Sequence, residues 1–405
     1  MKTLPTSTNE EEHQRRTLAR LRNQSWRTAV LLLAPWLLTI ILCWSILYND
    51  PITILGLLPG LAVAIHIQNH LSRHLASNHR PFEINRLFST LGAANWITLL
   101  RASSIVALAG FLPLAIQHDH GLLDFNALAW TPGIIYLGVS MADLLDGFMA
   151  RKQGRETELG KQMDIVTDAA GLLVASLLAV ALGRLPVIYL FVGLAYYPFI
   201  FGIWLRHKRA LPVVALQSRP YSRIIAGVQM GLVGMALLPI FNPAFTFLAA
   251  YICMTPLLIG FYRDWLVVSC RLKTDNHQQS SLDRLARSSM KPLPLALRLI
   301  IIAGGITTLA CYSFAQTDPS WQLAHSLLCL LAGIGFLGRS ASLALLLLLA
   351  SSQSPFGTTL LAMTIACTAA ALMLTGTGAK SLWAPEDEIL YRRKKESVMT
   401  DCEAS

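Results

Sequence analysis

Four aspartates fall within the stretch Asp143–Asp168, and they are the residues whose types and spacing point most directly to chemistry. Asp143 and Asp146 are three residues apart, whereas Asp164 and Asp168 are four apart. On a helix, each of these pairs lies on one face. Strongly apolar runs flank the stretch on both sides, and an acid at membrane depth costs several kcal/mol unless it is paired. This placement favours a functional site over solvated acids in a loop.

The polar segment Arg151–Arg155 separates the two pairs and predicts a turn between two antiparallel helices. The helices would then face each other with two carboxylates each, and two divalent cations would neutralise that charge. Hard oxygen ligands with no neighbouring His or Cys favour Mg²⁺, Mn²⁺ or Ca²⁺ over zinc. Two such ions are a common device for phosphoryl chemistry. Gly147 and Gly160 would let a ligand approach the backbone closely, and Arg151 supplies a forked donor for phosphate.

The spacing of this stretch resembles the signature of the CDP-alcohol phosphotransferases. All eight fixed positions of the signature are present without a break: Asp143, Asp146, Gly147, Ala150, Arg151, Gly160, Asp164 and Asp168. The resemblance implies an all-α polytopic membrane enzyme with a six-helix core and a site open to the cytosol. Such an enzyme uses the hydroxyl of an acceptor alcohol to displace CMP from a CDP-linked donor.

The resemblance also implies roles for single residues. The four aspartates would hold two divalent cations, taken as Mg²⁺ or Mn²⁺, and Asp168 would also be the general base. Contacts to the nucleotide are implied for Asn95, Thr98, Gly147, Ala150, Arg151, Thr157 and Gly160. Asn95 and Thr98 belong to the segment Ala94–Arg101, which resembles the "N-x-I-T-x-x-R" opening of the family's first core helix, although Ala94 replaces a common Pro. The alternative is an interfacial Asn, Trp and Arg at a helix mouth.

The composition independently indicates a polytopic membrane protein. The chain has 405 residues, of which 54% are hydrophobic and only 14% charged, with a mean hydropathy of +0.51; soluble domains carry about 25% charged residues. A net charge of +10 suits cytosolic loops that face anionic lipid. No basic domain or aromatic platform supports a nucleic-acid partner. The seven cysteines form no CxxC pair and are interpreted as small hydrophobes.

The apolar segments predict twelve spans. Two precede the core, Ala29–Leu47 and Ile52–Gln68. The six core helices are predicted at Ile97–Ile116, Trp130–Ala150, Gly160–Leu182, Pro186–Leu205, Ser222–Phe241 and Ala244–Cys270. Four segments follow, at Leu295–Phe314, Leu323–Gly338, Ser340–Leu349 and Phe356–Leu374. The corresponding parts of the chain are an N-terminal region (1–94), a catalytic domain (95–271), a cytosolic linker (272–293) and a C-terminal membrane domain (294–405) with a basic tail.

The loop charges predict the orientation. Gln117–Ala129 carries two acids and no Lys or Arg, which places it outside. The loops Arg151–Arg155, Arg206–Arg223 and Arg271–Lys291 are basic, which places them inside. We therefore expect an integral protein of the inner (cytoplasmic) membrane with both termini and the aspartate turn in the cytosol. By resemblance to the family, a homodimer through core helices is also expected.

Several features leave alternatives open. A basic run at Arg206, Lys208, Arg219 and Arg223 would bind a phosphorylated acceptor or the donor pyrophosphate, or is ordinary positive-inside charge. His66, His70 and His74 follow helical spacing, which suits a metal stripe or polar residues at a membrane exit. The amphipathic segment Phe82–Leu91 predicts a short surface helix. The tail Gly376–Leu382 resembles the "G-x-G-x-x-S-L" ending of DoxX-type four-helix membrane proteins, which assigns no chemistry.

Three functional hypotheses follow. The first is a transferase of phospholipid biosynthesis that moves a phosphatidyl group from CDP-diacylglycerol to a small polar or phosphorylated alcohol within the bilayer. The second is a transporter or ion-coupled carrier, which would predict inverted repeats; residues 272–405 hold no second copy of the aspartate motif. The third is an inactive scaffold that keeps the fold. The intact signature favours the first.

Overall fold

A computed structural model gives the arrangement of the elements. It describes residues 6–46, 51–81, 83, 87–116, 126–153, 156–214, 220–272, 292–311, 318–378 and 381–383. Within these ranges the chain is helical, with isolated β-bridges as its only extended pairing, so the predicted all-α class is confirmed. The chain divides into two compact units, Met1–Pro239 with Ala250–Leu272, and Ile240–Ala249 with Lys273–Ser405. The finer domain bounds drawn from the sequence stay predictions.

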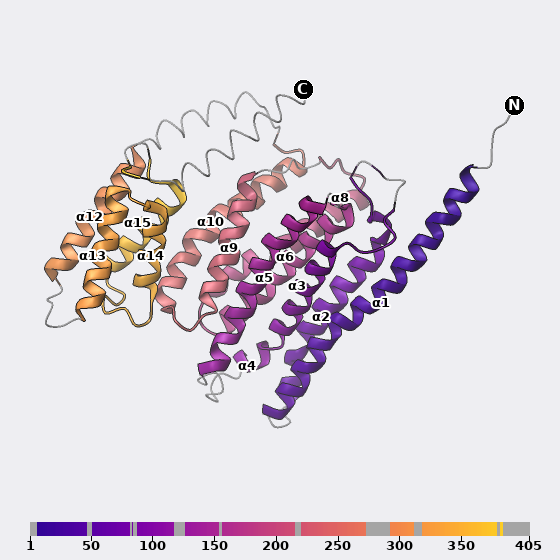
Figure 1. Cartoon of the computed structure of the whole chain (residues 1–405), viewed down its shortest axis with the longest axis horizontal. Coiled ribbons are helices and arrows are strands. Elements are labelled where there is room, and N and C mark those ends of the chain that lie inside the picture. Colours follow the sequence, from indigo (N-terminus) through magenta and orange to yellow (C-terminus); the bar gives the residue numbers. More distant parts are fainter. Residues whose placement is uncertain are drawn as a thin grey trace. The chain divides into compact units, whose positions relative to one another are not determined.

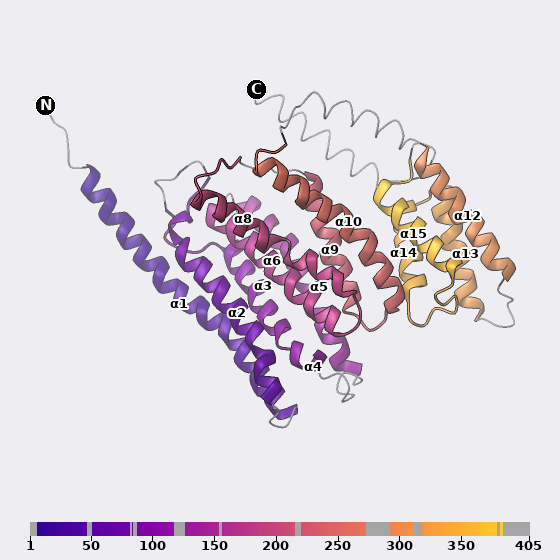
Figure 2. The same ribbon diagram turned by 180° about the vertical axis from the view of Figure 1, so that it is seen from behind.

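Two long helices begin the first unit. α1 (Thr6–Ile46) and α2 (Pro51–Arg73) run side by side in both views (Figures 1 and 2). Gln68 locks them together, because it accepts a hydrogen bond from Thr28 Oγ1 at 3.0 Å and donates to the Ser25 carbonyl at 2.8 Å. The polar lead-in and the first predicted span are thus one continuous helix from Thr6.

The surface helix predicted at Phe82–Leu91 is wrong in the part of this segment that the structure describes. Leu87 forms an antiparallel bridge with His79, and residues 88–92 are not helical. The cause is Asn78, whose buried amide donates to the carbonyls of Phe88 and Thr90 at 3.1 and 3.2 Å. A side chain that donates hydrogen bonds to two backbone carbonyls satisfies groups that a helix would otherwise pair, and so stabilises a non-helical conformation.

The next helices form the centre of the unit: α3 (Ala93–Ala109), α4 (Leu112–Ile116), α5 (Asn126–Gln153) and α6 (Glu158–Ala181). α3 packs against both α5 and α6. It approaches α6 closely because a Cβ at Gly171 would lie only 2.9 Å from Ile105 Cδ1. The predicted helix Ile97–Ile116 is broken into α3 and α4 by a turn at Gly110. α5 continues to Gln153, so the first three residues of the predicted turn are helical; Gly154 and Arg155 lie outside the described residues.

The remaining helices of the unit are η3 (Val187–Tyr189), α7 (Leu190–Leu194), α8 (Tyr196–Lys208), α9 (Pro220–Ala236) and part of α10 (Pro243–Val268). The single helix predicted at Pro186–Leu205 is instead a pair, α7 and α8, bent by 45°. Gln229 ties α9 to two neighbours: it accepts from Tyr189 Oη at 2.5 Å and donates to the Cys253 carbonyl at 2.5 Å. A buried amide that is satisfied on both sides fixes these helices in register.

The second unit holds four helices, which match the four predicted C-terminal segments: α12 (Leu293–Cys311), α13 (Pro319–Ile334), α14 (Gly338–Ala350) and α15 (Leu360–Thr375). Buried Arg298 on α12 donates to the Gly333 carbonyl at 2.7 Å. Asp318 caps α13, and hydrogen bonds from the backbone N–H and hydroxyl of Ser320 lower the pKa of its carboxyl. In the tail motif, Gly376 and Gly378 have φ angles of 84° and 77°, a region that side chains disfavour.

The helix surfaces and lengths agree with a membrane environment. Among the described residues, α6, α10 and α12 are long and apolar enough to cross a bilayer, and the bent pair α7–α8 would make a fourth span. Large apolar side chains stand exposed on three central helices: Leu100 at 58%, Ile134 at 59% and Ile165 at 54%. Lipid tails are the natural cover for such surfaces. The chain is a multi-pass membrane protein; the full count of twelve spans stays a prediction.

Candidate functional site

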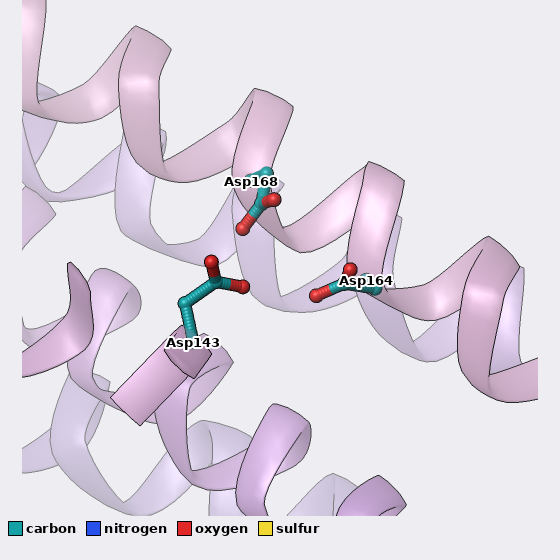
Figure 3. Close-up of side chains that lie close together, drawn as sticks. All are labelled: Asp143, Asp164 and Asp168. Atoms are coloured by element: carbon teal, nitrogen blue, oxygen red, sulfur yellow. The ribbon is translucent and has the colours of Figure 1, made fainter. Parts of the chain in front are cut away.

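Three of the four predicted aspartates come together between α5 and α6. Asp143 projects from α5, while Asp164 and Asp168 project from successive turns of α6, and the three carboxylates point toward one another (Figure 3). One oxygen from each lies within 4.8 Å of the other two. The side chains are partly exposed, at 29%, 43% and 29%, so the cluster is reachable from outside the helix bundle. The helix pairing that positions them is the one predicted from the spacing.

Arg101 on α3 forms the floor of this cluster. Its guanidinium lies 2.8 Å from an Asp143 oxygen and 2.9 Å from an Asp164 oxygen, and it also donates a hydrogen bond to Asp168. The Arg101 side chain is only 1% exposed. A buried cation needs such partners, because leaving water is costly for an unpaired charge. The planar guanidinium has five donors, which lets one residue serve three carboxylates.

Sequence reasoning missed the role of Arg101. The residue was recognised as part of the "N-x-I-T-x-x-R" segment but was assigned no function. A signal was nevertheless present, since Arg101 is the only charged residue in the predicted span Ile97–Ile116. Asn95, Thr98 and Arg101 also follow three-residue spacing, which places them on one face of α3. All three are buried on that face.

Among the side chains that the structure describes, three carboxylates contact one guanidinium at the cluster. Acidic groups therefore outnumber the basic group in this described set, which favours binding of an external cation. The donor set consists of carboxylate oxygens alone, the kind that Mg²⁺ and Mn²⁺ prefer. The geometry therefore fits a hard divalent cation on the open side of the cluster, with Arg101 closing the buried side. Asp146, the fourth predicted ligand, lies on α5, but its side chain is outside the described part of the structure.

A second group of predicted residues meets at the N-terminus of α6. Thr157 caps this helix, with its Oγ1 accepting a hydrogen bond from the Gly160 N–H at 3.0 Å. Asn95 reaches the same place from α3: a Cβ built on Gly160 would lie 2.8 Å from Asn95 Oδ1. The Asn95 side chain is 7% exposed, and its Nδ2 has no partner among the described residues. A helix N-terminus with a spare buried donor suits an anionic or carbonyl-rich ligand.

The other predicted nucleotide contacts are placed less fully. Thr98 is buried one turn after Asn95, and its hydroxyl donates to the Ala94 carbonyl at 3.1 Å. Three of these residues, Gly147, Ala150 and Arg151, lie on α5, but the surroundings of these positions are outside the described part of the structure. Their roles therefore stay predictions.

The structure describes the side chains of two of the four residues predicted to contact the acceptor, Arg206 and Lys208. Arg206 donates to the carbonyls of Pro212 at 2.8 Å and Ser269 at 3.2 Å, so its guanidinium joins the end of α8 to the end of α10. Lys208 lies 5.2 Å from the centre of the Trp204 ring, a cation–π distance. Arg219 and Arg223 lie outside the residues whose side chains are described.

The histidine stripe on α2 does not form a compact metal cluster among the described residues, where the aspartate triad is the one group with suitable geometry. The rings of His70 and His74 stack with centroids 4.2 Å apart, and His74 Nδ1 lies 2.8 Å from the His70 carbonyl. Of the two interpretations of the stripe, polar residues at a membrane exit agree better with these contacts.

Comparison with protein families gives one match. Residues 91–262 match the family model described as CDP-alcohol phosphatidyltransferase. No curated protein and no solved structure matches the chain at a significant level. The matched range contains the aspartate triad, Arg101 and the group around Gly160.

Proposed function

We propose, from the premise that residues 91–262 are a CDP-alcohol phosphatidyltransferase domain of a multi-pass membrane protein, that this chain transfers a phosphatidyl group from CDP-diacylglycerol to an acceptor alcohol with release of CMP. The observation that carries the proposal is the cluster of Asp143, Asp164 and Asp168 around buried Arg101. These carboxylates would hold divalent cations, which would supply positive charge for a bound pyrophosphate. Family membership supports the transfer from a CDP-alcohol; the particular donor is our inference.

The aspartates would hold two divalent cations, Mg²⁺ or Mn²⁺, with Asp146 as the fourth ligand. When bound, these cations neutralise charge on the pyrophosphate oxygens and on the leaving CMP. Arg101 holds Asp143, Asp164 and Asp168 in place from the buried side, so the ligand oxygens are preorganised before substrate binds. The free energy needed to bring the carboxylates together is then spent once, when the protein folds, and is not needed again in each catalytic cycle.

Asn95, Thr157 and Gly160 would hold the nucleotide beside the aspartates. Asn95 Nδ2 has no partner among the described residues and could donate a hydrogen bond to a cytosine carbonyl or a phosphate oxygen. Gly160 has to lack a side chain because a Cβ there would meet Asn95 Oδ1 at 2.8 Å and Thr157 Oγ1 at 3.1 Å. The N–H groups of the first turn of α6 add a positive dipole end.

Replacing Gly160 with Ala is expected to lower kcat/KM for the CDP-linked donor by roughly ten- to a hundredfold, because displacement of Asn95 misplaces the nucleotide. Steady-state kinetics with varied donor measures the effect, and calorimetry of CDP binding checks that binding is the affected step. Gly138→Ala is the matched control, since a Cβ at Gly138 on α5 meets nothing within 4 Å. Equal kinetics in the two variants would contradict the assignment.

The reaction then proceeds by direct attack of the acceptor on the donor. The acceptor hydroxyl oxygen forms a bond to the phosphorus that carries the lipid, and the bond from that phosphorus to the CMP oxygen breaks. Asp168 takes the hydroxyl proton, and CMP leaves with the bonding electron pair. Positioning, charge neutralisation and one base are sufficient for this step. The described Cys–His contact, between Cys329 Sγ and the His325 ring at 3.7–3.9 Å, lies on α13 outside the matched range, so it suggests no covalent intermediate at this site.

The acceptor is proposed to be a small polar or phosphorylated alcohol that arrives from the cytosolic side. The basic residues Lys208, Arg219 and Arg223 of this segment support an anionic acceptor. Arg206 fixes the end of α8 to the end of α10. Cytosolic placement rests on the basic loops around the aspartate turn. A homodimer is proposed only from family resemblance.

The test is CMP release by the purified full-length chain in nanodiscs with CDP-diacylglycerol and Mg²⁺ or Mn²⁺. Candidate acceptors, including glycerol phosphate, inositol phosphate and serine, are added one at a time. Release that requires both the cation and one acceptor supports the proposal and identifies the acceptor. Metal-dependent binding of CDP-diacylglycerol without release would contradict the acceptor assignment. If the protein binds no nucleotide, the proposed enzymatic function is wrong, and a carrier or scaffold is favoured.

A further inference from the structure

A basic cleft opens between α1 and α2, in the part of the chain that precedes the matched domain. Its volume is about 540 Å³. Arg22 on α1 and Arg73 at the end of α2 line it, together with the polar side chains of Asn69 and Ser72. The family match begins at residue 91, so none of these residues belongs to the transferase domain.

The wall of the cleft is preformed by hydrogen bonds between the two helices. Gln68 donates to the Ser25 carbonyl at 2.8 Å and accepts from Thr28 Oγ1 at 3.0 Å. Ser25 and Thr28 are both buried, at 3% and 0% exposure. A ligand that enters the cleft therefore meets a fixed surface, and little ordering of protein side chains opposes its binding.

The two arginines are available to an anion. Both side chains are exposed, and among the described residues neither takes part in an ion pair. A guanidinium presents two parallel N–H donors that match phosphate oxygens. Arg22 and Arg73 line one cleft from different helices, which is the arrangement that holds a phosphate from two sides. The amide of Asn69 and the hydroxyl of Ser72 add neutral donors.

Beyond the cleft, along α1 and α2, the exposed side chains change from charged to apolar. Trp26, which lines the cleft one turn beyond Arg22, is 68% exposed. The next turn brings Val30 on α1, at 69% exposure, and Ile65 lies one turn before Gln68 and Asn69 on α2, at 49% exposure. A free phosphate leaves this exposed hydrocarbon uncovered. A phosphate attached to acyl chains covers it, and tryptophan is typical of the level where headgroups meet tails.

We propose that the α1–α2 cleft binds an anionic phospholipid, with the headgroup phosphate between Arg22 and Arg73 and the acyl chains along Val30 and Ile65. This lipid is distinct from the substrate of the transferase domain, and the inference does not rest on the proposed reaction. Basic residues at the membrane surface attract anionic lipid in general. The cleft adds a shaped, prebuilt site to that attraction.

The test uses the full-length chain in nanodiscs of phosphatidylcholine with increasing phosphatidylglycerol, and native mass spectrometry measures the lipid that the protein retains. Arg22→Gln/Arg73→Gln is compared with Arg15→Gln/Arg271→Gln, which removes the same charge from exposed positions outside the cleft. The cleft variant is expected to lose about tenfold in apparent affinity for phosphatidylglycerol, whereas the control keeps wild-type affinity. If both variants lose the same affinity for phosphatidylglycerol, the effect is due to general surface charge, and the proposal is overturned.

Two further arms separate the sources of the phosphate and verify the fold. Glycerol phosphate and inorganic phosphate are titrated in place of the lipid, and competition by either at a concentration comparable to the lipid would overturn the lipid assignment. Phosphatidylglycerol should raise the midpoint of thermal unfolding in the wild type and in the control, but not in the cleft variant. Because both arginines are exposed, all three proteins should share one midpoint in pure phosphatidylcholine. A lower midpoint of the cleft variant there would assign the arginines to stability and not to lipid binding.

Discussion

Replacing Asp168 with Asn is expected to lower the rate of CMP release by roughly a thousandfold or more. The amide is nearly isosteric, and its carbonyl oxygen still accepts the hydrogen bond from Arg101, so the helices stay in place. The amide nevertheless cannot take the acceptor proton, and it removes one negative charge from a triad whose oxygens lie within 4.8 Å of one another. The assay is CMP release at saturating donor, acceptor and Mg²⁺.

A control and a second readout separate catalysis from folding. Glu158→Gln removes an acid from the same helix, where Glu158 has only a partly exposed contact with Lys161 at 3.8 Å, and should leave the rate nearly unchanged. The thermal midpoint of Asp168→Asn should respond less to added Mg²⁺ or Mn²⁺ than that of the wild type. If Asp168→Asn releases CMP at a rate within tenfold of the wild type, Asp168 is not the general base.

Replacing Arg101 with Met should make the stability of the protein depend on divalent cations. The variant leaves Asp143, Asp164 and Asp168 facing one another without the buried cation that now contacts all three. Removing one partner from a fully buried ion pair costs about 3–5 kcal/mol, and the loss here is smaller because the three carboxylates are 29–43% exposed. In chelator, the unfolding midpoint should therefore fall well below that of the wild type. Added Mg²⁺ or Mn²⁺ should recover much of the difference, because the cation then supplies the missing positive charge.

Arg101→Lys is the matched variant for this experiment. It keeps the charge but loses the forked geometry that reaches three carboxylates, so its midpoint should lie between those of the wild type and Arg101→Met. Scanning calorimetry or intrinsic fluorescence measures the midpoints without any need for activity. If Arg101→Met unfolds at the wild-type temperature in chelator, the network does not stabilise the fold, and Arg101 acts only on the reaction.

The spacing of the aspartates was sufficient to predict that carboxylates of two helices come together. Residues three and four apart on two helices joined by a short turn have few ways to meet, so the pairing of Asp143 with Asp164 and Asp168 follows from local geometry. Arg101 could not be assigned in the same way. Two of its three partners lie 63 and 67 residues later on α6 and the third, Asp143, lies on α5. Only the packing of α3 against α5 and α6 brings them together.

Two of the predicted elements differ from the structure. Phe82–Leu91 has an amphipathic pattern, but Asn78 captures the carbonyls of Phe88 and Thr90 and holds this part of the chain as a loop. The apolar run of Pro186–Leu205 shows no interruption of hydropathy, yet it bends by 45° between α7 and α8. Long helices were predicted correctly where the apolar pattern alone decides. Breaks set by a side chain elsewhere were not visible.

The buried network around Arg101 also constrains how the protein is made. The chain is synthesised from its N-terminus, so α3 presents its arginine to the bilayer before α5 and α6 exist to neutralise it. A lone arginine at the centre of a helix costs about 2.5–3.5 kcal/mol on insertion, and the carboxylates on α5 and α6 would each be penalised if those helices entered singly. The order of lowest cost is for α3 to wait at the insertion machinery until α5 and α6 emerge, and for the three helices to enter the lipid together, with Arg101 already in contact with its carboxylates. Correct charge pairing is thus a condition of biogenesis as well as of the finished site.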